Sequence, residues 1–283
     1  MKMSIGEQLT YSTIRIICNL DGGLISTGTG FFFNFCENEE KCVPAIVTNK
    51  HVVKGAKTGL FRFSVYDKNE NRAQGEKLDV NIENFEQQWI KHPDENVDLC
   101  ALPIASIINT AVKNGKRPFY VSLTKDIIPS KEQLKELEPI EDVVMIGYPD
   151  GIWDEKNNLP IARKGITATH PGIEFNGKSE FMIDIACFNG SSGSPAFIYN
   201  RGAYPGKNGV VVGNRILFIG VVYAVAQHKV AGRIEFCPMP TVNVNNIQPM
   251  PITDIPNNLA LAIMAEELLA FETIFSNMEE EKQ

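Results

Sequence analysis

A loop of serines and glycines is the segment of this chain best suited to carry a nucleophile. It runs Asn189-Gly190-Ser191-Ser192-Gly193-Ser194-Pro195. A serine on a tight turn of small residues exposes its hydroxyl, and the backbone N–H groups next to it can converge on an oxyanion. A serine hydroxyl is a poor nucleophile until a base takes its proton, and the base must be held by a third group. The loop therefore predicts acyl-transfer chemistry only if a histidine and a carboxylate can reach it.

Two residues from the first half of the chain fit these roles. His51 follows an apolar run that ends at Thr48 and two turn residues, a position from which a side chain can point into a cleft. Asp98 is a lone carboxylate at the start of a second apolar run, where it is costly unless a donor such as an imidazole N–H pairs with it. His51, Asp98 and Ser192 are thus the candidate catalytic residues. We expect exposed or locally hydrogen-bonded rings for the other histidines, His92, His170 and His228.

The elements around these residues are short apolar runs rich in β-branched and aromatic side chains, separated by Gly, Pro, Asn and Asp. This pattern is typical of an all-β sandwich or barrel. The dipeptide Asn176-Gly177 predicts a hairpin, because a type I′ turn needs positive φ at both central residues. The strands expected are 12–18, 29–35, 43–48, 60–66, 99–103, 142–147, 181–185, 196–199 and 216–226.

The chain changes character at three places after the first group of strands. The charged run 130–139 is expected to be a short helical or irregular connection between two β units. Beyond Cys237 five prolines remove backbone donors, and we expect an extended surface segment rather than a central strand. Residues 257–280 predict an amphipathic helix, which we expect to dock on the same molecule in preference to binding a partner. Its apolar residues at helical spacing are Leu261, Met264, Leu268, Phe271 and Phe275.

Composition and charge exclude several classes of protein. The 283 residues carry 27 basic and 34 acidic side chains, a net charge of -7, without a Lys/Arg cluster that could follow a phosphate backbone. Nucleic acid is therefore not expected as a partner. No apolar run is long enough for a membrane span or a secretory leader, so the expected location is the cytoplasm. In that reducing compartment the six cysteines are expected to be free thiols, and their spacing shows no metal-binding pattern.

Six short motifs of the sequence resemble, in the same order along the chain, motifs of trypsin-like serine peptidases, and most of all those of the bacterial Deg/Htr-type catalytic domains. Three are similar to the histidine motif, the aspartate strand and the nucleophile loop of that family: Thr48-Asn49-Lys50-His51-Val52-Val53, Val97-Asp98-Leu99-Cys100-Ala101-Leu102 and Gly190-Ser191-Ser192-Gly193-Ser194-Pro195. The other three are Gly28-Thr29-Gly30-Phe31, Gly147-Tyr148-Pro149 and Arg163-Lys164-Gly165-Ile166-Thr167-Ala168. The resemblance extends from about Tyr11 to Ala226.

The resemblance implies an all-β fold of two antiparallel six-stranded barrels with a C-terminal helix. Residues 1–125 would form the barrel with His51 and Asp98, residues 126–237 the barrel with Ser192, and residues 238–283 the proline-rich segment and helix. The implied activity is that of a serine endopeptidase, which cleaves protein or peptide substrates through an acyl-enzyme without a cofactor or a metal. The N–H groups of Gly190 and Ser192 would form the oxyanion hole. The backbone of Tyr223, Ala224 and Val225 would pair with the extended substrate.

The sequence departs from the secreted digestive members of this family in two places. Ser191 stands where those enzymes have an aspartate that pairs with a freed N-terminus, so activation by N-terminal clipping is not expected. On this resemblance Ala186 occupies the position of the acidic pocket floor of trypsin, and with Tyr223 and Val225 it would form a pocket without charge. We therefore expect an uncharged residue before the cleaved bond. The alternative from another class is a catalytically silent relative that binds peptides in the same cleft.

Overall fold

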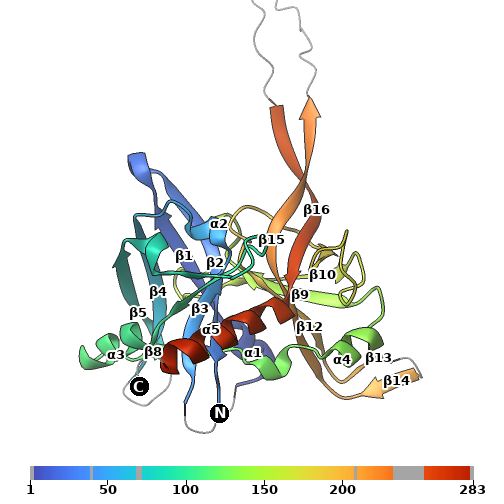
Figure 1. The fold of residues 1–283 in the computed structure, drawn as a ribbon, viewed down its shortest axis with the longest axis horizontal. Helices are drawn as coiled ribbons and strands as arrows, with labels where there is room; N and C mark the ends of the chain where they lie inside the picture. The colour runs from blue at the N-terminus through green and yellow to red at the C-terminus, as the bar shows by residue number, and fades with distance from the viewer. Residues whose placement is uncertain (1–2, 39–40, 68–71, 207–208, 232–251, 281–283) are drawn as a thin grey trace, which may run out of the picture.

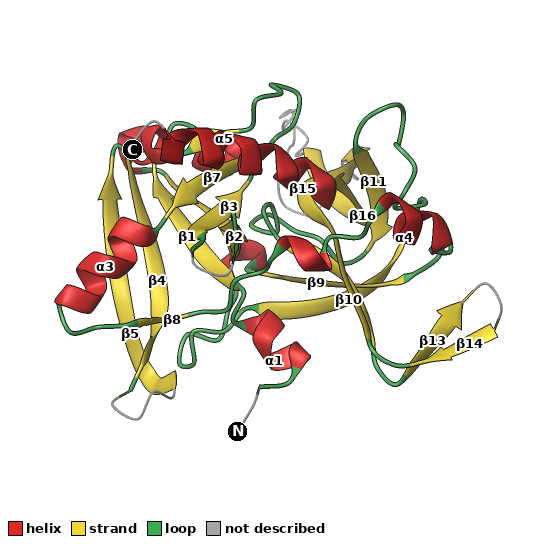
Figure 2. Cartoon of the chain, turned by 60° about the horizontal axis from the view of Figure 1, so that its bottom comes forward, coloured by secondary structure: helices red, strands yellow, loops and turns green. Residues whose placement is uncertain are grey.

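The computed structural model describes residues 3–38, 41–67, 72–206, 209–231 and 252–280. Two antiparallel β systems lie next to each other, with helices on their outside (Figure 1 and Figure 2). The α-helices and 3₁₀ helices (η) are α1 (Ile5–Thr10), η1 (Asp21–Gly23), α2 (Lys50–Val53), η2 (Phe85–Gln88), α3 (Ala105–Lys113), η3 (Lys125–Ile127), α4 (Lys131–Glu136), η4 (Pro149–Gly151), η5 (Ala265–Leu268) and α5 (Leu269–Glu280).

The N-terminal half forms one antiparallel sheet. Its strands are β1 (Thr13–Asn19), β2 (Ile25–Phe35), β3 (Val43–Thr48), β4 (Thr58–Tyr66), β5 (Arg72–Glu83), β6 (Ile90–Lys91), β7 (Cys100–Pro103) and β8 (Pro118–Phe119). The order along the sheet is β5-β4-β1-β2-β3-β7-β6, with β8 paired to β4. Alternation explains why these runs form strands. In β1, the side chains of Ile14, Ile16 and Cys18 are buried, while Arg15 and Ile17 between them are partly exposed.

The expected closure of this sheet into a six-stranded barrel is not shown. Its edges are β5 and β6, which do not pair with each other in the part of the chain that the structure describes. The connection between them runs through η2, which contains Phe85. The ring of Phe85 packs so closely on Gly59 that a Cβ added to Gly59 would lie 2.3 Å from the ring. Phe85 also packs edge-on against Phe61 and Trp89. Aromatic side chains therefore fill this end of the sheet, beside backbone hydrogen bonds from Phe85 to Lys57 and from Glu86 to Ala56.

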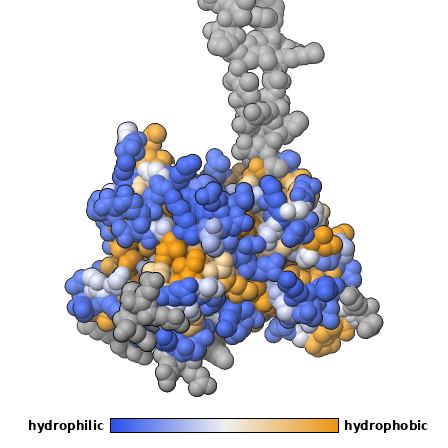
Figure 3. All heavy atoms as spheres, in the orientation of Figure 1, coloured by the Kyte–Doolittle hydropathy of each residue, from blue (hydrophilic) through white to orange (hydrophobic). Residues whose placement is uncertain are grey.

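The C-terminal half closes into a barrel of six strands. They are β9 (Asp142–Gly147), β10 (Ile161–Thr167), β11 (Glu180–Asp184), β12 (Pro195–Asn200), β15 (Arg215–Ala231) and β16 (Ile252–Met264), in the order β10-β11-β16-β15-β12-β9. The predicted hairpin at Asn176-Gly177 is confirmed, because the two residues have φ of 54° and 73° and Phe175 pairs with Lys178. A second hairpin, β13 (Ala203–Gly206) and β14 (Gly209–Val212), extends from the barrel. It exposes apolar valines, and hydrophobic residues are visible at this edge in Figure 3.

One strand of the barrel comes from a segment for which the sequence analysis expected no central strand. β16 pairs with β15 on one side and β11 on the other, so the prediction of a surface segment leading into a helix at residue 257 is wrong for residues 252–264. Pro256 is tolerated because β11 pairs only with residues 259–263, and because a register shift in β15 lies beside its partner Gln227. Cys237 and the other four prolines lie outside the described residues.

The C-terminal helix is shorter than predicted, and it packs on the body of the molecule as expected. α5 follows η5 directly, and Leu268, Phe271 and Phe275 are buried. The rings of Phe271 and Phe275 lie 5.8 Å and 5.1 Å from that of Phe35 in β2. The buried cluster around them includes side chains of both β systems, so the helix covers the junction between the two halves (Figure 2).

The connection predicted at residues 130–139 contains the short helix α4. A capping box begins it, since the hydroxyl of Ser130 accepts the N–H of Gln133 and the side chain of Gln133 accepts the N–H of Ser130. Neither this helix nor any other in the described residues is long and apolar enough to cross a membrane.

Truncation of Phe271 tests how much the C-terminal helix contributes to the fold. Phe271→Ala is expected to lower the free energy of unfolding by about 3 to 5 kcal/mol, because it leaves a cavity among buried side chains. Urea unfolding measures the change. Met278→Ala on the same helix is the matched control: Met278 is 37% exposed, and its truncation should change the free energy by about 0.5 kcal/mol or less. Equal effects of the two variants would contradict the packing described for α5.

Candidate active site

The candidate base and its carboxylate partner are brought together by the register of two strands. β3 pairs with β7 so that Thr48 lies opposite Cys100. In an antiparallel pair, the residues that follow Thr48 face those that precede Cys100, which puts His51 in α2 beside Asp98. Asn49 fixes this corner, because its Nδ2 donates to the backbone carbonyl of Asp98 at 2.8 Å.

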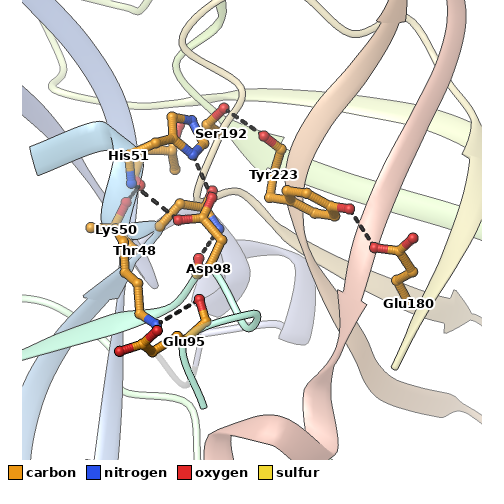
Figure 4. A network of polar contacts seen from close by, with 10 residues as sticks. Thr48, Lys50, His51, Glu95, Asp98, Glu180, Ser192 and Tyr223 are labelled. Carbon is orange, nitrogen blue, oxygen red and sulfur yellow. Dashed lines mark hydrogen bonds and ion pairs between the residues drawn. The ribbon is translucent and has the colours of Figure 1, made fainter. Parts of the chain in front are cut away.

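Asp98 holds His51 by two hydrogen bonds. Its Oδ1 accepts the backbone N–H of His51 at 3.1 Å, and its Oδ2 lies 2.5 Å from Nδ1 of the ring. An ionised carboxylate can only accept, so the proton in this contact lies on Nδ1, and in the neutral ring Nε2 then keeps a lone pair. The side chain of His51 is 46% exposed, and Figure 4 shows its ring next to Asp98 and Ser192. The ring can therefore take a proton from a group that approaches Nε2.

Ser192 lies on the loop between β11 and β12, flanked by two glycines in the left-handed region. Gly190 and Gly193 have φ of 82° and 86°, and a Cβ at either position would meet backbone oxygen at 2.6 Å or less. The hydroxyl of Ser192 donates to the carbonyl of Tyr223 at 3.3 Å. No hydrogen bond joins it to His51 among the described residues, so the serine must leave this rotamer before the base can accept its proton.

The backbone N–H groups predicted for an oxyanion hole are free to donate to a ligand oxygen. Neither the N–H of Gly190 nor that of Ser192 has an acceptor within the described parts of the chain. The N–H groups next to them are used, since Ser191 donates to Phe188 at 3.0 Å and Gly193 donates to Val222 at 2.8 Å. Two unpaired donors around one serine are the arrangement that stabilises an oxyanion.

β15 has a free backbone edge next to Ser192. β12 pairs with β15 only as far as Val221, whereas β16 follows the other edge of β15 as far as Ala231. Residues 223–225 therefore lie beyond the end of β12, and no described strand pairs with them on that side. The register between β15 and β16 also shifts at Tyr223. Bulges that cause such shifts are common next to active sites. An extended peptide can add to such an edge as a further strand.

Glu180 anchors the side chain of Tyr223, a contact that no local pattern in the sequence predicts. The hydroxyl of Tyr223 donates to Oε2 of Glu180, a buried residue at the start of β11. Burial, followed by the effect of this carboxylate, raises the pKa of the Tyr223 phenol, so that it remains a protonated donor. Figure 4 shows the ring directed away from Ser192 and toward Glu180.

Ala186, the predicted pocket floor, is exposed, and it lies next to a cation that no pattern in the sequence assigns to the site. Nη1 of Arg163 donates to the carbonyl of Ala186, and its guanidinium lies 5.1 Å from the ring centre of Phe188. Arg163 lies in one of the sequence motifs that resemble the family, residues 163–168. Strand alternation alone does not predict which cation reaches the loop at residues 186–188.

His92 is buried rather than exposed, and its ring makes a local hydrogen bond, which was the other predicted possibility. Its Nε2 lies 3.1 Å from the carbonyl of Glu267, and its Nδ1 accepts the N–H of Asp94. The ring thus joins η5 to the loop that leads to Asp98. His170 bonds locally, as expected, to the N–H of Gly172.

The described residues contain no group of three or more His, Cys, Asp or Glu side chains that could hold a metal ion. The five described cysteines are free. Burial raises the pKa of Cys18 to about 12, so this thiol is a packing group rather than a nucleophile.

Comparison with known proteins gives one family and several solved structures. The family model of the trypsin-like peptidase domain matches residues 28–204, whereas the curated proteins give no significant match. The active form of the Rv3671c protease from M. tuberculosis is 16% identical, with a TM-score of 0.45 over 92% of this chain and 79% of that one. The HtrA-type protease AlgW with a tripeptide is 15% identical, with a TM-score of 0.48 over 96% and 62%. The thermostable serine protease AL20 from an extremophilic microorganism is 11% identical, with a TM-score of 0.49 over 94% and 97%.

The segment matched by the family model spans more than half of the 283 residues. It includes helix α2 with His51, the loop before β7 with Asp98, and the loop that carries Ser192. On this evidence the chain belongs to the trypsin-like peptidase domain family, as the resemblance of its sequence predicted.

Proposed function

We propose that this chain is a serine endopeptidase and that Ser192, His51 and Asp98 are its catalytic residues. Ser192 attacks the carbonyl carbon of the scissile peptide bond while Nε2 of His51 takes the serine proton. The N–H groups of Gly190 and Ser192 stabilise the tetrahedral oxyanion, which collapses as His51 gives its proton to the leaving amine. Water, activated by the same base, then hydrolyses the acyl-enzyme.

The pair of hydrogen bonds from Asp98 to His51 is the observation that carries this proposal. One bond fixes the backbone of α2 and the other fixes the ring, so the imidazole has a defined orientation and a defined tautomer. The carboxylate also stabilises the imidazolium that forms during the attack. A histidine with a purely structural role would not need a half-exposed ring with a serine beside it.

The two halves of the molecule supply different parts of this machinery. We assign the base and the orienting carboxylate to an N-terminal unit, residues 1–125, and the nucleophile to the C-terminal barrel, to which β16 belongs. A peptide or protein substrate lies along the free edge of β15, at Tyr223, Ala224 and Val225. Backbone pairing of this kind holds any extended sequence, so selectivity falls to the side-chain pocket beside Ala186.

Replacement of the nucleophile is the direct test of the proposal. Ser192→Ala should lower turnover by about a million-fold and abolish labelling by a fluorophosphonate probe, because it removes the attacking oxygen. Ser194→Ala is the matched control in the same loop: the buried Ser194 hydroxyl has no hydrogen-bond partner, so its loss should leave activity within a few-fold of the wild type. Labelling at Ser194, or full activity without Ser192, would show that the nucleophile is misassigned.

The same probe separates the proposal from its rival, a catalytically silent peptide binder. The silent relative would bind peptides along β15 and leave Ser192 unlabelled. Isothermal titration with a product peptide, run beside the labelling experiment, therefore distinguishes an inactive binder from an inactive preparation.

Replacement of the orienting carboxylate tests the role of the pair of hydrogen bonds. Asp98→Asn keeps the size of the side chain but presents an amide N–H or a weaker acceptor to Nδ1, so the ring loses its tautomer preference. Turnover should fall by about ten-thousand-fold, with the thermal unfolding curve little changed. A loss of less than tenfold would mean that Asp98 does not orient the base.

The residue before the cleaved bond is expected to be uncharged. Burying an unpaired charge beside Ala186, Tyr223 and Val225 costs several kcal/mol, whereas each buried methylene contributes about 0.8 kcal/mol. Lys and Arg should be cleaved slowest, since Arg163 adds a positive charge next to Ala186. Values of kcat/KM for peptides that differ only at this position measure the preference. Selection for Lys or Arg would contradict the pocket, and selection for Asp or Glu that Arg163→Ala removes would make Arg163 the selecting residue.

A further inference from the structure

The carbonyl groups of the nucleophile loop are held by hydrogen bonds from other segments. The carbonyl of Asn189 accepts the N–H of Asp150 at 2.5 Å, that of Gly190 accepts the hydroxyl of Thr29 at 2.9 Å, and that of Ser192 accepts the N–H of Thr29 at 2.9 Å. In a trans peptide the C=O of one residue and the N–H of the next point in opposite directions. A held carbonyl therefore also sets the direction of the N–H that follows it.

Thr29 is the residue through which most of these contacts pass. It lies in β2 and is fully buried, yet each of its polar atoms has a partner. Besides its two bonds to the loop, its hydroxyl accepts the N–H of Tyr148 at 3.0 Å, and its carbonyl accepts the hydroxyl of Thr48 at 2.7 Å. Tyr148 precedes η4, which supplies the N–H of Asp150 to the loop, so the hydroxyl of Thr29 supports that contact as well.

The loop has little else that ties it to the N-terminal half. Ser191 bonds within the loop, where its hydroxyl accepts the N–H of Phe188 and its carbonyl accepts the N–H of Ser194. Within the described residues, the hydrogen bonds between this loop and the N-terminal sheet are those of Thr29. The two peptides that it holds lie on either side of the peptide that carries the Ser192 N–H.

We propose that the hydroxyl of Thr29 is a positioning group that sets the direction of the oxyanion donors at Gly190 and Ser192. The inference rests on the proposed function, because it concerns the same oxyanion hole. Without the hydroxyl, the carbonyl of Gly190 and the N–H of Tyr148 are both left without a partner in a buried site. The Gly190–Ser191 peptide lies between the two peptides that carry the N–H groups of Gly190 and Ser192. Its rotation is then opposed by fewer contacts, and the donors on either side lose their preset geometry.

The test compares Thr29→Val, which removes only the hydroxyl, with Thr29→Ser, which keeps it. Thr29→Val should lower kcat by about a hundredfold, the size of losing one oxyanion donor, while KM stays within about threefold. Affinity for a peptide aldehyde, which forms an oxyanion on Ser192, should fall by a similar factor, whereas affinity for the same peptide as an unreactive amide should not change. Thr29→Ser should restore each quantity to within about threefold of the wild type.

Thr167→Val is a matched control for the general cost of losing a buried bridging hydroxyl. Thr167 is as buried as Thr29, and its hydroxyl likewise donates to a carbonyl, of Pro139, and accepts an N–H, of Glu141. Both valine variants should lower the melting temperature, but only Thr29→Val should lose aldehyde affinity. Equal kinetic effects in the two variants, or a Thr29→Val enzyme with unchanged kcat, would overturn the inference.

Amide hydrogen exchange in residues 189–193 separates this inference from the proposed function. If the wild type neither cleaves peptides nor reacts with fluorophosphonate, the proposed function fails. The positioning role still holds if Thr29→Val exchanges these amides faster than Thr167→Val does. It is overturned if the two variants exchange them at the same rate.

Discussion

The hydrogen bonds of Thr29 are the constraint on which the rest of the site depends. Three of them, to Tyr148, Gly190 and Ser192, join residues more than a hundred positions apart in the chain and cross from the N-terminal sheet to the C-terminal barrel. A typical hydrogen bond contributes only about 1 kcal/mol net, but a buried polar group left without a partner costs about 1 to 3 kcal/mol. Sliding one half against the other would leave several buried polar groups without a hydrogen-bond partner at once. The relative position of His51 and Ser192 is therefore set by buried polar contacts as well as by apolar packing.

Close approach of backbones explains why the sequence motifs that resemble the family contain so many small residues. A Cβ at Gly193 would meet the carbonyl oxygen of Thr29 at 1.9 Å, and one at Gly147 would meet the hydroxyl of Ser194 at 2.0 Å. A Cβ at Gly28 would meet the side chain of Val52 at 2.4 Å, so α2 can lie on β2 only because this position is glycine. The glycines thus determine how near the segments with the base and the nucleophile can come to each other.

The candidate catalytic residues could be predicted from the sequence, because few residue types can fill these roles and a short recognisable motif surrounds each residue. The sequence did not allow prediction of contacts that depend on how distant segments meet, such as Arg163 on the carbonyl of Ala186 or Glu180 on Tyr223. β16 was missed for a different reason. Leu261 and Met264 have helical spacing to Leu268, but pairing with β11 and β15 outweighs that local pattern, and Pro256 lies where only one neighbour is paired. The closure of a sheet is likewise a property of its edges, and no local pattern in the sequence specifies it.

The segment after residue 251 is a working part of the proposed site rather than an addition to a finished protease domain. β16 occupies one edge of β15, and this leaves the other edge as the place where a substrate strand can pair. Immediately after β16, the carbonyl of Glu267 receives the hydrogen bond from the ring of His92, at the start of the loop that leads to Asp98. Phe271 then packs on His92 and on Phe35, the last residue of the strand that also contains Thr29. A single stretch of chain therefore supports the substrate edge, the carboxylate loop and the strand that positions the nucleophile, so these three parts are mechanically linked through it.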